Sequence, residues 1–411
     1  MNKIIKNSFI LIISLFIIAD TCFAQSGWFS QSTGKIDNLI SVSFTDVNNG
    51  TIVGWDGTIL RTTNGGTNWN SQESGTKNIL IGVCFTDANN GTAVGFSGTI
   101  LRTTNGGVNW NSQSAGTSIS LLNVSFSDAQ NGTAVGAQGT ILRTTNGGVI
   151  WTSQTSGTIN DLWDVSFTDA SNGTAVGESG TILRTTNGGV IWTPQTSGVT
   201  RDLRGVSFTN ALTGTAVGYD GIILRTTNGG SIWTSQTSGT SILLTDVCFT
   251  DGNNGTVVGD FGFIVRTTNG GANWNYQSSG TPFLLYGISF TDANNGTAVG
   301  IIGVIIRTTT GGVISVKQIG SEIPESFALF QNFPNPFNPE TNINFSIPKS
   351  GLVTLKIYDI SGKEVSTLVN EVKNAGSYEV GFNAAYLPGG TYFYRMQTDG
   401  FTGTKKMMLI K

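Results

Sequence analysis

Between Asp161 and Asp220 the chain gathers acids, arginines and aromatic residues that could do chemistry. The acids are Asp161, Asp164, Glu178, Asp202 and Asp220, the arginines are Arg201 and Arg204, and the aromatic residues are Trp163 and Tyr219. Paired carboxylates are the catalytic groups of glycoside hydrolases, so glycan hydrolysis is one chemistry that this set allows. Exposed Trp and Tyr beside Arg are also favoured at recognition surfaces. Of these two interpretations we favour binding.

The sequence contains no histidine. Ser-His-Asp and Cys-His catalysis and His-containing metal sites all depend on an imidazole, so these classes are excluded. Of three cysteines, Cys22 lies in the N-terminal leader. Cys84 and Cys248 occupy one repeat position, four repeats apart, that carries serine in the other repeats. We expect them to be buried serine substitutes, too far apart for a disulfide.

Charged residues are scarce, and neither sign dominates. They make up 11% of the 411 residues, with 22 Lys+Arg against 25 Asp+Glu and a net charge of -3. A partner with a phosphate backbone demands a basic excess, so nucleic acid is not expected as a partner. The 56 glycines fit many short strands joined by tight turns.

One segment, Gly57 to Gly66, organises the chain. It reads Gly-Thr-Ile-Leu-Arg-Thr-Thr-Asn-Gly-Gly and returns six more times with small changes, without insertion or deletion. Its arginine recurs every 41 residues. The positions are Arg61, Arg102, Arg143, Arg184, Arg225, Arg266 and Arg307. A strict period of this length indicates supersecondary units that are stacked or arranged radially.

Each unit predicts four short strands. In the first unit these are residues 39–46, 51–54, 58–63 and 68–72, separated by turns such as Asn49-Gly50. Asn-Gly and Gly-Gly pairs between β-rich runs are strong hairpin signals. Four antiparallel strands per unit at this period predict a blade, and therefore an all-β fold with a seven-bladed β-propeller over residues 25–316.

A tryptophan series indicates how the ring closes. It runs through Trp28, Trp69, Trp110, Trp151, Trp192, Trp233 and Trp274, whereas the position after Trp274 is Ser315. Because Trp28 has the outer-strand pattern with no inner strands before it, we expect the N-terminal strand to complete blade seven. Closure would remove the open sheet edges of the array. The alternative is that residues 313–319 form that strand.

The repeats differ from one another mainly on one face. With this strand order, the turn between the second and third strands lies on the same face as the loop between blades. That turn, at Gly54 to Gly57 in the first repeat, varies, as does the residue entering each inner strand. Variation confined to one face of a repeat scaffold indicates the binding face. The predicted binding residues are Trp55, Asp56, Phe96, Asp161, Trp163, Asp164, Glu178, Arg201, Asp202, Arg204, Tyr219, Asp220, Asp260 and Tyr286.

The periodic arginines and tryptophans are expected to be structural. An acidic series with the same period, broken only at Asn210, falls near the arginines at Asp46, Asp87, Asp128, Asp169, Asp251 and Asp292. We expect the two series to form ion pairs, because an unpaired half-buried charge is costly. The alternative is a basic ring for an acidic partner.

The two ends of the chain predict further segments. Residues 1–24 begin with Lys3 and Lys6, continue with the apolar run from Phe9 to Ala19, and end in small residues typical of a cleaved signal peptide. That run is too short to span a bilayer. Residues 317–332 are predicted to be a linker, and residues 333–411 contain six short alternating runs that predict a small Ig-like β-sandwich.

The repeat motifs resemble a known group of propellers. Thr62-Thr-Asn-Gly-Gly-Thr-Asn-Trp69 and its copies resemble the Asp-box of bacterial neuraminidase repeats. With the Val-x-Phe-Thr-Asp and Asn-Gly-Thr-Ala-Val-Gly segments, residues 28–314 resemble the propeller of the photosystem II assembly and stability factor family. This resemblance implies the fold. A sialidase-like site would need three converging arginines, and only Arg201 and Arg204 are available beyond the periodic ones.

The last 85 or so residues resemble the type A sorting domain of the type IX secretion system. The matching residues are Phe327–Pro339, Val353–Asp359, Ser361-Gly362, Leu387–Met396 and Lys405–Lys411. The resemblance implies Sec export through the leader, then passage across the outer membrane directed by the tail. It also implies removal of the tail and release or surface attachment of the protein.

We therefore expect a secreted or cell-surface propeller that is a non-catalytic binding or scaffold module for an extracellular protein or polysaccharide. One alternative is a glycan-active enzyme, glycoside hydrolase or sialidase-like, that uses carboxylates of the variable face. Another, which follows from the family resemblance, is an assembly factor for a membrane protein complex. We expect a monomer without cofactor, metal or transmembrane segment after leader removal, whose residues 333–411 engage the type IX machinery.

Overall fold

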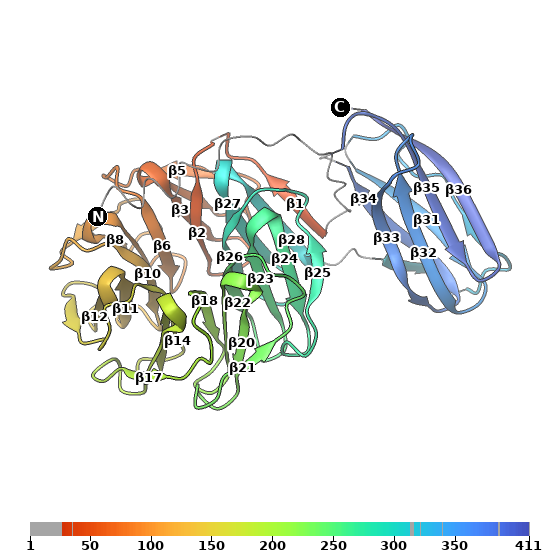
Figure 1. Ribbon diagram of the computed structural model, residues 1–411. Helices are drawn as coiled ribbons and strands as arrows, with labels where there is room; N and C mark the ends of the chain where they lie inside the picture. Colours follow the sequence, from red (N-terminus) through yellow and green to blue (C-terminus); the bar gives the residue numbers. More distant parts are fainter. Residues whose placement is uncertain are drawn as a thin grey trace. The chain divides into compact units, whose positions relative to one another are not determined.

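The computed structural model describes residues 27–34, 36–312, 316–320, 322–338, 340–384 and 387–410. The described residues separate into two compact units, one that ends before Val316 and one that begins there. The first is a ring of antiparallel sheets and the second a pair of sheets (Figure 1). The predicted signal peptide at residues 1–24 lies outside the described residues.

The first unit contains seven four-stranded antiparallel sheets, which are the seven blades. Blade 1 comprises β2 (Leu39–Phe44), β3 (Gly50–Gly54), β4 (Ile59–Thr62) and β5 (Asn70–Gln72), and blade 2 comprises β6 (Leu80–Phe85), β7 (Gly91–Gly95), β8 (Thr99–Thr103) and β9 (Asn111–Gln113). Blade 3 comprises β10 (Leu121–Phe126), β11 (Gly132–Gly136), β12 (Ile141–Thr144) and β13 (Thr152–Gln154), and blade 4 comprises β14 (Leu162–Phe167), β15 (Gly173–Gly177), β16 (Ile182–Thr185) and β17 (Thr193–Gln195). Blade 5 comprises β18 (Leu203–Phe208), β19 (Gly214–Gly218), β20 (Ile223–Thr226) and β21 (Thr234–Gln236), and blade 6 comprises β22 (Leu244–Phe249), β23 (Gly255–Gly259), β24 (Phe263–Thr267) and β25 (Asn275–Ser278). Blade 7 comprises β26 (Leu285–Phe290), β27 (Gly296–Gly300), β28 (Ile305–Gly312) and β1 (Gly27–Gln31).

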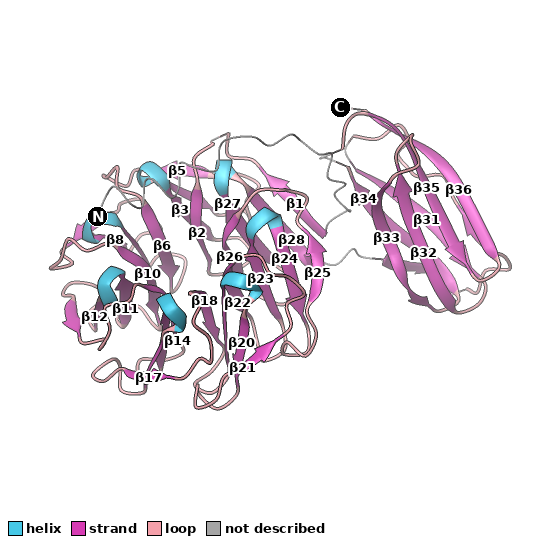
Figure 2. Ribbon diagram, in the orientation of Figure 1, coloured by secondary structure: helices cyan, strands magenta, loops and turns pink. Residues whose placement is uncertain are grey.

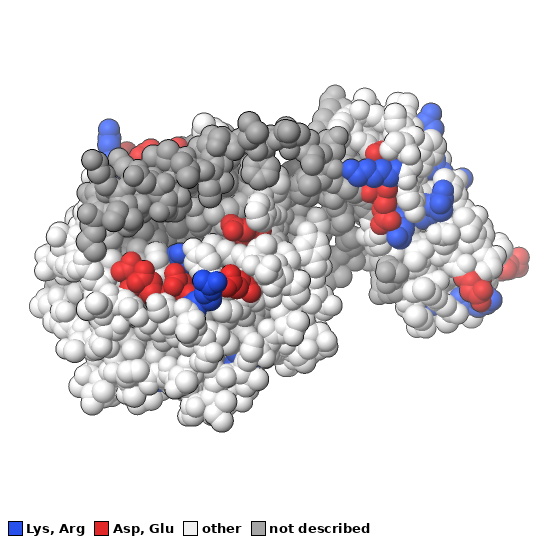
Figure 3. Space-filling model, viewed as in Figure 1, with Lys and Arg blue, Asp and Glu red and all other residues white. Residues whose placement is uncertain are grey.

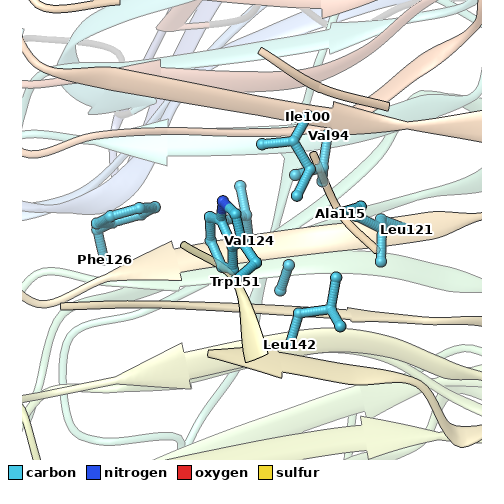
Figure 4. Close-up of a cluster of buried hydrophobic side chains, with 9 residues drawn as sticks. Val94, Ile100, Ala115, Leu121, Val124, Phe126, Leu142 and Trp151 are labelled. Carbon is cyan, nitrogen blue, oxygen red and sulfur yellow. The ribbon is translucent and has the colours of Figure 1, made fainter. Parts of the chain in front are cut away.

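The hydrophobic core lies between neighbouring blades. Figure 4 shows one such layer, in which Val94 and Ile100 of blade 2 face Leu121, Val124 and other residues of blade 3. The second and third strands of each blade are buried at nearly every position, which is why they do not alternate between buried and exposed residues. Each blade therefore buries its apolar surface only against its neighbours.

The N-terminal strand closes the ring, as the tryptophan series predicts. β1 pairs antiparallel with β28, so the first and last strands of the propeller lie side by side (Figure 1). Trp28 is 2% exposed, and its indole Nε1 donates to Gln277 Oε1 at 3.0 Å. Its ring packs edge-on against Phe290 with 5.7 Å between centroids. Trp28 thus fills the place that Trp69 fills in blade 1, where the same Trp–Phe and Trp–Gln contacts recur.

A second set of contacts joins the innermost strands. The free edge of each first strand, on the side away from the second strand, would leave the amide of its last phenylalanine unpaired. In every blade this N–H donates to a serine hydroxyl or cysteine thiol of the preceding blade, for example Phe85 N to Ser43 Oγ at 3.0 Å and, across the closure, Phe44 N to Ser289 Oγ at 3.1 Å. Cys84 and Cys248 accept at 3.4 Å in the same way and are free thiols.

The periodic arginines also connect neighbouring blades, but with partners other than those expected. Arg61 Nη1 donates to Thr51 Oγ1 at 2.9 Å, and Nη2 donates to the backbone carbonyl of Ala88 in the next blade at 2.8 Å. Its guanidinium lies 5.0 Å from the ring centroid of Phe85. The same carbonyl and ring contacts recur at the other six arginines.

The expected ion pairs between arginines and the acidic series are not formed among the described residues. The Asp46 carboxylate instead accepts the amides of Asn48 and Asn49 at 2.8 and 2.9 Å and so shapes its own turn. Asn210, which interrupts the acidic series, does the same for Leu212 and Thr213. The acids are local turn residues, which explains why Asn replaces Asp there without loss.

The second unit is a sandwich of two four-stranded sheets. One sheet has the order β29 (Val316–Gly320), β34 (Gly376–Asn383), β31 (Glu340–Ile347) and β30 (Ala328–Leu329). The other has the order β33 (Glu364–Lys373), β32 (Gly351–Tyr358), β35 (Gly390–Thr398) and β36 (Phe401–Leu409). Inward-facing residues such as Phe345, Ile357 and Tyr394 are fully buried.

The segment 317–332, which we expected to be a linker, contributes two strands to this sandwich. β29 pairs with β34, and β30 pairs with β31. The hydroxyl of Tyr394 accepts the amide of Asn332 and donates to the carbonyl of Phe330, both at 2.8 Å. These long-range contacts hold a segment whose own pattern is too short to indicate strands.

We predict that Trp28→Ala destabilises the propeller as much as a tryptophan truncation inside the ring does. Removing a buried indole costs about 3–5 kcal/mol, and the same loss is expected for Trp151→Ala in blade 3. Denaturant unfolding of the two variants and the wild type measures both values. A much smaller loss for Trp28→Ala would mean that the N-terminal strand does not carry the closure.

Candidate binding face

Seven short turns lie on one face of the propeller, where each second strand passes into the third (Figure 2). They are 3-10 turns named η1 (Trp55–Gly57), η2 (Phe96–Gly98), η3 (Ala137–Gly139), η4 (Glu178–Gly180), η5 (Tyr219–Gly221), η6 (Asp260–Gly262) and η7 (Ile301–Gly303). Each contains the variable dipeptide of its repeat. We call this side the variable face, defined by η1 to η7 and the loops between blades.

The backbone of these turns is the same in all blades, although their residues differ. The second residue of every turn has a positive φ, from 52° at Asp56 to 57° at Asp220. Asp tolerates this left-handed conformation. For a β-branched side chain such as that of Ile302, at φ 56°, the same conformation is a steric outlier. The side chain of Ile302 is half exposed, so burial does not offset this strain.

Arg204 is the centre of a side-chain cluster on this face. Its guanidinium carbon lies 3.7 Å from the ring centroid of Trp163 in blade 4 and 5.0 Å from that of Tyr219 in its own blade. Nη2 donates to the Tyr219 hydroxyl at 3.0 Å. The structure therefore brings together three of the predicted binding residues, as a cation stacked between two aromatic rings.

Tyr286 and Asp260 extend this cluster toward blades 6 and 7. Burial raises the pKa of Tyr286 to about 12, with a further rise from the Asp260 charge and an opposing effect of Arg204. The Tyr286 hydroxyl consequently remains protonated at neutral pH and can donate a hydrogen bond. Burial also raises the pKa of Asp260. We define the Arg204 cluster as Trp163, Arg204, Tyr219, Asp260 and Tyr286.

Most other predicted acids of blades 4 and 5 are engaged in the turns themselves. Asp161 Oδ1 accepts the amide of Gln138 at 2.8 Å, and Asp202 Oδ1 accepts that of Ser179 at 3.0 Å. Glu178 Oε2 accepts the amide of Asp161 at 3.1 Å. These carboxylates fix the loops between blades by satisfying backbone donors.

Arg201 and Asp220 form an ion pair with 2.6 Å between Nε and Oδ2. Both side chains are more than half exposed, so the pair contributes little to stability. The predicted residues Trp55 and Asp56 belong to blade 1 and Phe96 to blade 2, whereas the Arg204 cluster belongs to blades 4 to 7. On the face seen in Figure 3, charged side chains gather over β10 and β18, and most of the surrounding surface is uncharged.

Asp164 does not lie on the surface of the variable face. It is 6% exposed and sits on an innermost strand, where Oδ1 accepts the amide of Val165 and Oδ2 that of Val206 in the next blade, both at 2.7 Å. Asn123 Nδ2 donates to the same carboxylate. Burial, and then the charge of Asp246, raise its pKa well above the ordinary range.

Asp246 is a second inner-strand carboxylate, which sequence reasoning missed. Its oxygens accept the amides of Val247 at 2.7 Å and Ile288 in the next blade at 2.9 Å. Burial raises its pKa to about 7. Its repeat position reads Ser41, Gly82, Asn123, Asp164, Gly205, Asp246 and Gly287, and this variation was the signal available in the sequence.

We predict that Asp246 makes the propeller less stable as pH rises. Its pKa is about 7 in the folded state against 3.8 for the ordinary group, so folding favours the protonated form. The stabilisation is complete below pH 3.8 and is lost as pH rises through about 7. Unfolding free energy measured from pH 4 to 8 should fall less steeply in Asp246→Asn than in the wild type.

The control for this prediction is Asp87→Asn. Hydrogen bonds, chiefly from the Asn90 side chain, lower the pKa of Asp87, so its contribution changes only below pH 3.8. Asp87→Asn should leave the slope between pH 4 and 8 unchanged. An equal slope in Asp246→Asn and the wild type would contradict the assignment.

We predict that Ile302→Gly stabilises the propeller by about 1 kcal/mol, because glycine adopts the left-handed conformation without a steric cost. Asp56→Gly is the matched control at the equivalent turn position, where aspartate already tolerates this conformation, and should change stability less. Midpoints of denaturant unfolding give both values. A destabilised Ile302→Gly would show that the isoleucine side chain contributes more than its strain costs.

Comparisons with known proteins agree with this architecture. Residues 331–411 match the family model described as the secretion system C-terminal sorting domain. Residues 151–242, which span the last strand of blade 3 and all of blades 4 and 5, match the model described as photosynthesis system II assembly factor YCF48. No curated protein matches the chain. No helix among the described residues is long and apolar enough to cross a membrane.

Solved structures with the same fold include two YCF48 proteins. The structure titled "YCF48 bound to D1 peptide" is 21% identical, with a TM-score of 0.60, and the match covers 69% of this chain and 97% of that one. YCF48 from Cyanidioschyzon merolae is 22% identical, with a TM-score of 0.59 and coverage of 68% and 98%. The WD40 propeller domain of Doa1 is 13% identical, with a TM-score of 0.57 and coverage of 69% and 95%.

At these identities the solved structures establish the fold, and the sorting-domain match establishes the export route. The chain is a β-propeller similar in fold to those of YCF48, followed by residues that match a secretion-system C-terminal sorting domain, which directs it by type IX secretion to the cell surface or outside the cell.

Proposed function

We propose that this protein is a non-catalytic binding module that recognises an extracellular protein or polysaccharide through its variable face. The observation that carries the proposal is the Arg204 cluster. The side chains repeated in every blade bond to one another and to the backbone of the next blade, whereas the stacked guanidinium of Arg204 forms no ion pair with a carboxylate of the described residues. Arg and aromatic side chains together are typical of recognition hot spots.

The arrangement of the acids supports binding over glycan hydrolysis. A glycosidase needs two carboxyl groups that face one space and are free to exchange protons or attack. Asp161, Glu178 and Asp202 are occupied by backbone amides, Asp164 is buried in an inner strand, and Asp220 pairs with Arg201. A catalytic role would require these groups to leave structural bonds.

The solved relative whose title names a D1 peptide shows that a propeller of this fold can present a peptide-binding surface. It supports the choice of a protein as one of the two partner classes. The sorting tail directs the protein to the cell surface or outside the cell, which supports a partner that is met there and, for an assembly role, a client at or beyond the outer membrane.

Binding of the full chain to arrays of bacterial and host glycans and of surface proteins tests the proposal. We expect at least one ligand to bind and none to be cleaved, as read by mass spectrometry of the recovered ligands. Cleavage that disappears on replacement of Glu178 or Asp202 by the corresponding amide would instead establish the glycan-active enzyme.

A matched pair of variants in blade 4 locates the surface. Ser179→Arg places a bulky charge at an exposed position of the variable face, and Val190→Arg places the same charge at an 80% exposed position on the opposite face. We expect Ser179→Arg to weaken binding about tenfold or more and Val190→Arg to leave it unchanged. The reverse pattern would move the binding surface to the other face.

A further inference from the structure

Arg204 differs from every other arginine of the described propeller. The seven periodic arginines donate to backbone carbonyls of the next blade, and Arg201 pairs with Asp220. Arg204 bonds neither a carboxylate nor a carbonyl. Its single described hydrogen bond runs to the Tyr219 hydroxyl, so no described anionic group pairs with the partly exposed guanidinium.

Two donors of this stacked pair have no acceptor. Arg204 Nε and Trp163 Nε1 are both buried atoms without a hydrogen-bond partner in the described protein. Buried donors are nearly always paired in folded proteins, and an unpaired one is destabilising. Donors from two adjacent side chains, one of them charged, are complementary to a group that only accepts hydrogen bonds, such as a carboxylate.

The surroundings of the cluster limit how much negative charge the ligand can carry. Asp161, Glu178, Asp202 and Asp260 lie in or bond to the turns of the same face, and of the positive groups nearby Arg201 already has its partner. These acids would repel a ligand that carries several anionic groups. They can accept hydrogen bonds from hydroxyl groups, and the protonated Tyr286 can donate one, so a hydroxyl-rich ligand with one carboxylate fits best.

An extended peptide fits this position less well than a sugar. Peptides commonly bind by adding a strand to an open sheet edge. The innermost strands near the cluster have their free amides bonded to serine, cysteine or aspartate side chains, for example Phe208 N to Ser166 Oγ at 3.1 Å and Val206 N to Asp164. The two inner-strand amides that follow Arg204 on its free edge, those of Val206 and Phe208, are therefore not open to an added strand.

We propose that the Arg204 cluster binds the carboxylate of a single acidic sugar within an otherwise neutral glycan. Arg204 holds the carboxylate, Trp163 contributes its indole N–H, and the surrounding acids accept the hydroxyls of the neighbouring sugars. The inference rests on the proposed binding function and narrows its ligand to a hexuronic-acid-bearing glycan.

The test uses the full chain and a matched series of probes in titration calorimetry. The probes are a neutral oligosaccharide, the same oligosaccharide with one terminal glucuronic acid, a polyuronate, and a short peptide with a free or an amidated C-terminus. We expect the singly acidic oligosaccharide to bind at least tenfold more tightly than the neutral one. The polyuronate should bind no more tightly per chain end than the singly acidic oligosaccharide does. Arg204→Gln should remove that preference, a loss of about tenfold to 100-fold.

Two further variants separate anchoring from folding. Trp163→Phe keeps an aromatic face for the guanidinium but removes the indole N–H, and we expect a loss of several-fold in affinity for the acidic probe. Lys77→Gln removes an exposed charge of the same sign from another loop of the variable face, between blades 1 and 2, and should retain the preference. Melting temperatures of all variants check that the propeller stays folded.

Each outcome decides a different point. An acidic-probe preference that survives Arg204→Gln overturns the anchor, although the binding function stands. Binding of the free-carboxylate peptide without the acidic oligosaccharide overturns the glycan and assigns the site to a chain terminus. Failure of the chain to bind any probe or array ligand overturns the binding function itself.

Discussion

The propeller depends on the hydrogen bonds by which side chains of each blade accept the free backbone amides of the next blade's innermost strand. A flat sheet leaves a row of unpaired amides at its edge, which costs stability and invites aggregation. Here the amide of the last inner-strand phenylalanine finds a serine hydroxyl or cysteine thiol of the preceding blade, seven times around the ring. The bond from Phe44 N to Ser289 Oγ joins blade 1 to blade 7, so this set of hydrogen bonds runs around the whole ring.

Contacts between neighbouring blades also provide the partners of the other repeated side chains. The arginine of one blade covers the phenylalanine and the turn carbonyl of the next, and the tryptophan of one blade bonds the glutamine of the previous one. Because each of these side chains already has at least one partner inside the ring, the framework offers little to a ligand. Recognition is therefore left to the positions that vary, and among those to Arg204, whose partners do not neutralise it.

The inner-strand acids show that variation does not by itself mark a binding residue. Asp164 and Asp246 replace small residues next to the variable position, but their carboxylates bond the amides of two successive inner strands. Ser41 at the equivalent position makes a similar contact between blades, because its hydroxyl accepts the amide of Val83 in the next blade. The two carboxylates connect blades and lie within the ring, whereas Arg204, one position away in the repeat, reaches the face.

Much of this architecture follows from the sequence, because a strict 41-residue period fixes which residues are equivalent. The period and the turn glycines determined the blade, the number of blades and the closing role of Trp28, since equivalent residues must make equivalent contacts. The sorting tail was likewise recognisable from its motifs. The variable turns could be assigned to one face from strand order, without coordinates.

Tertiary structure decided the partners of individual side chains. The arginines and the acids share a period and a rim, which suggested ion pairs, but side-chain reach and direction set Arg61 against a carbonyl and Asp46 against its own turn. Residues 316–320 and 328–329 became strands because edges of the sandwich were available to them, not because of a local pattern. The sequence determined which residues repeat, and only the packed ring determined which of those residues had a partner, because partners come from neighbouring blades that lie about 40 residues apart in the chain.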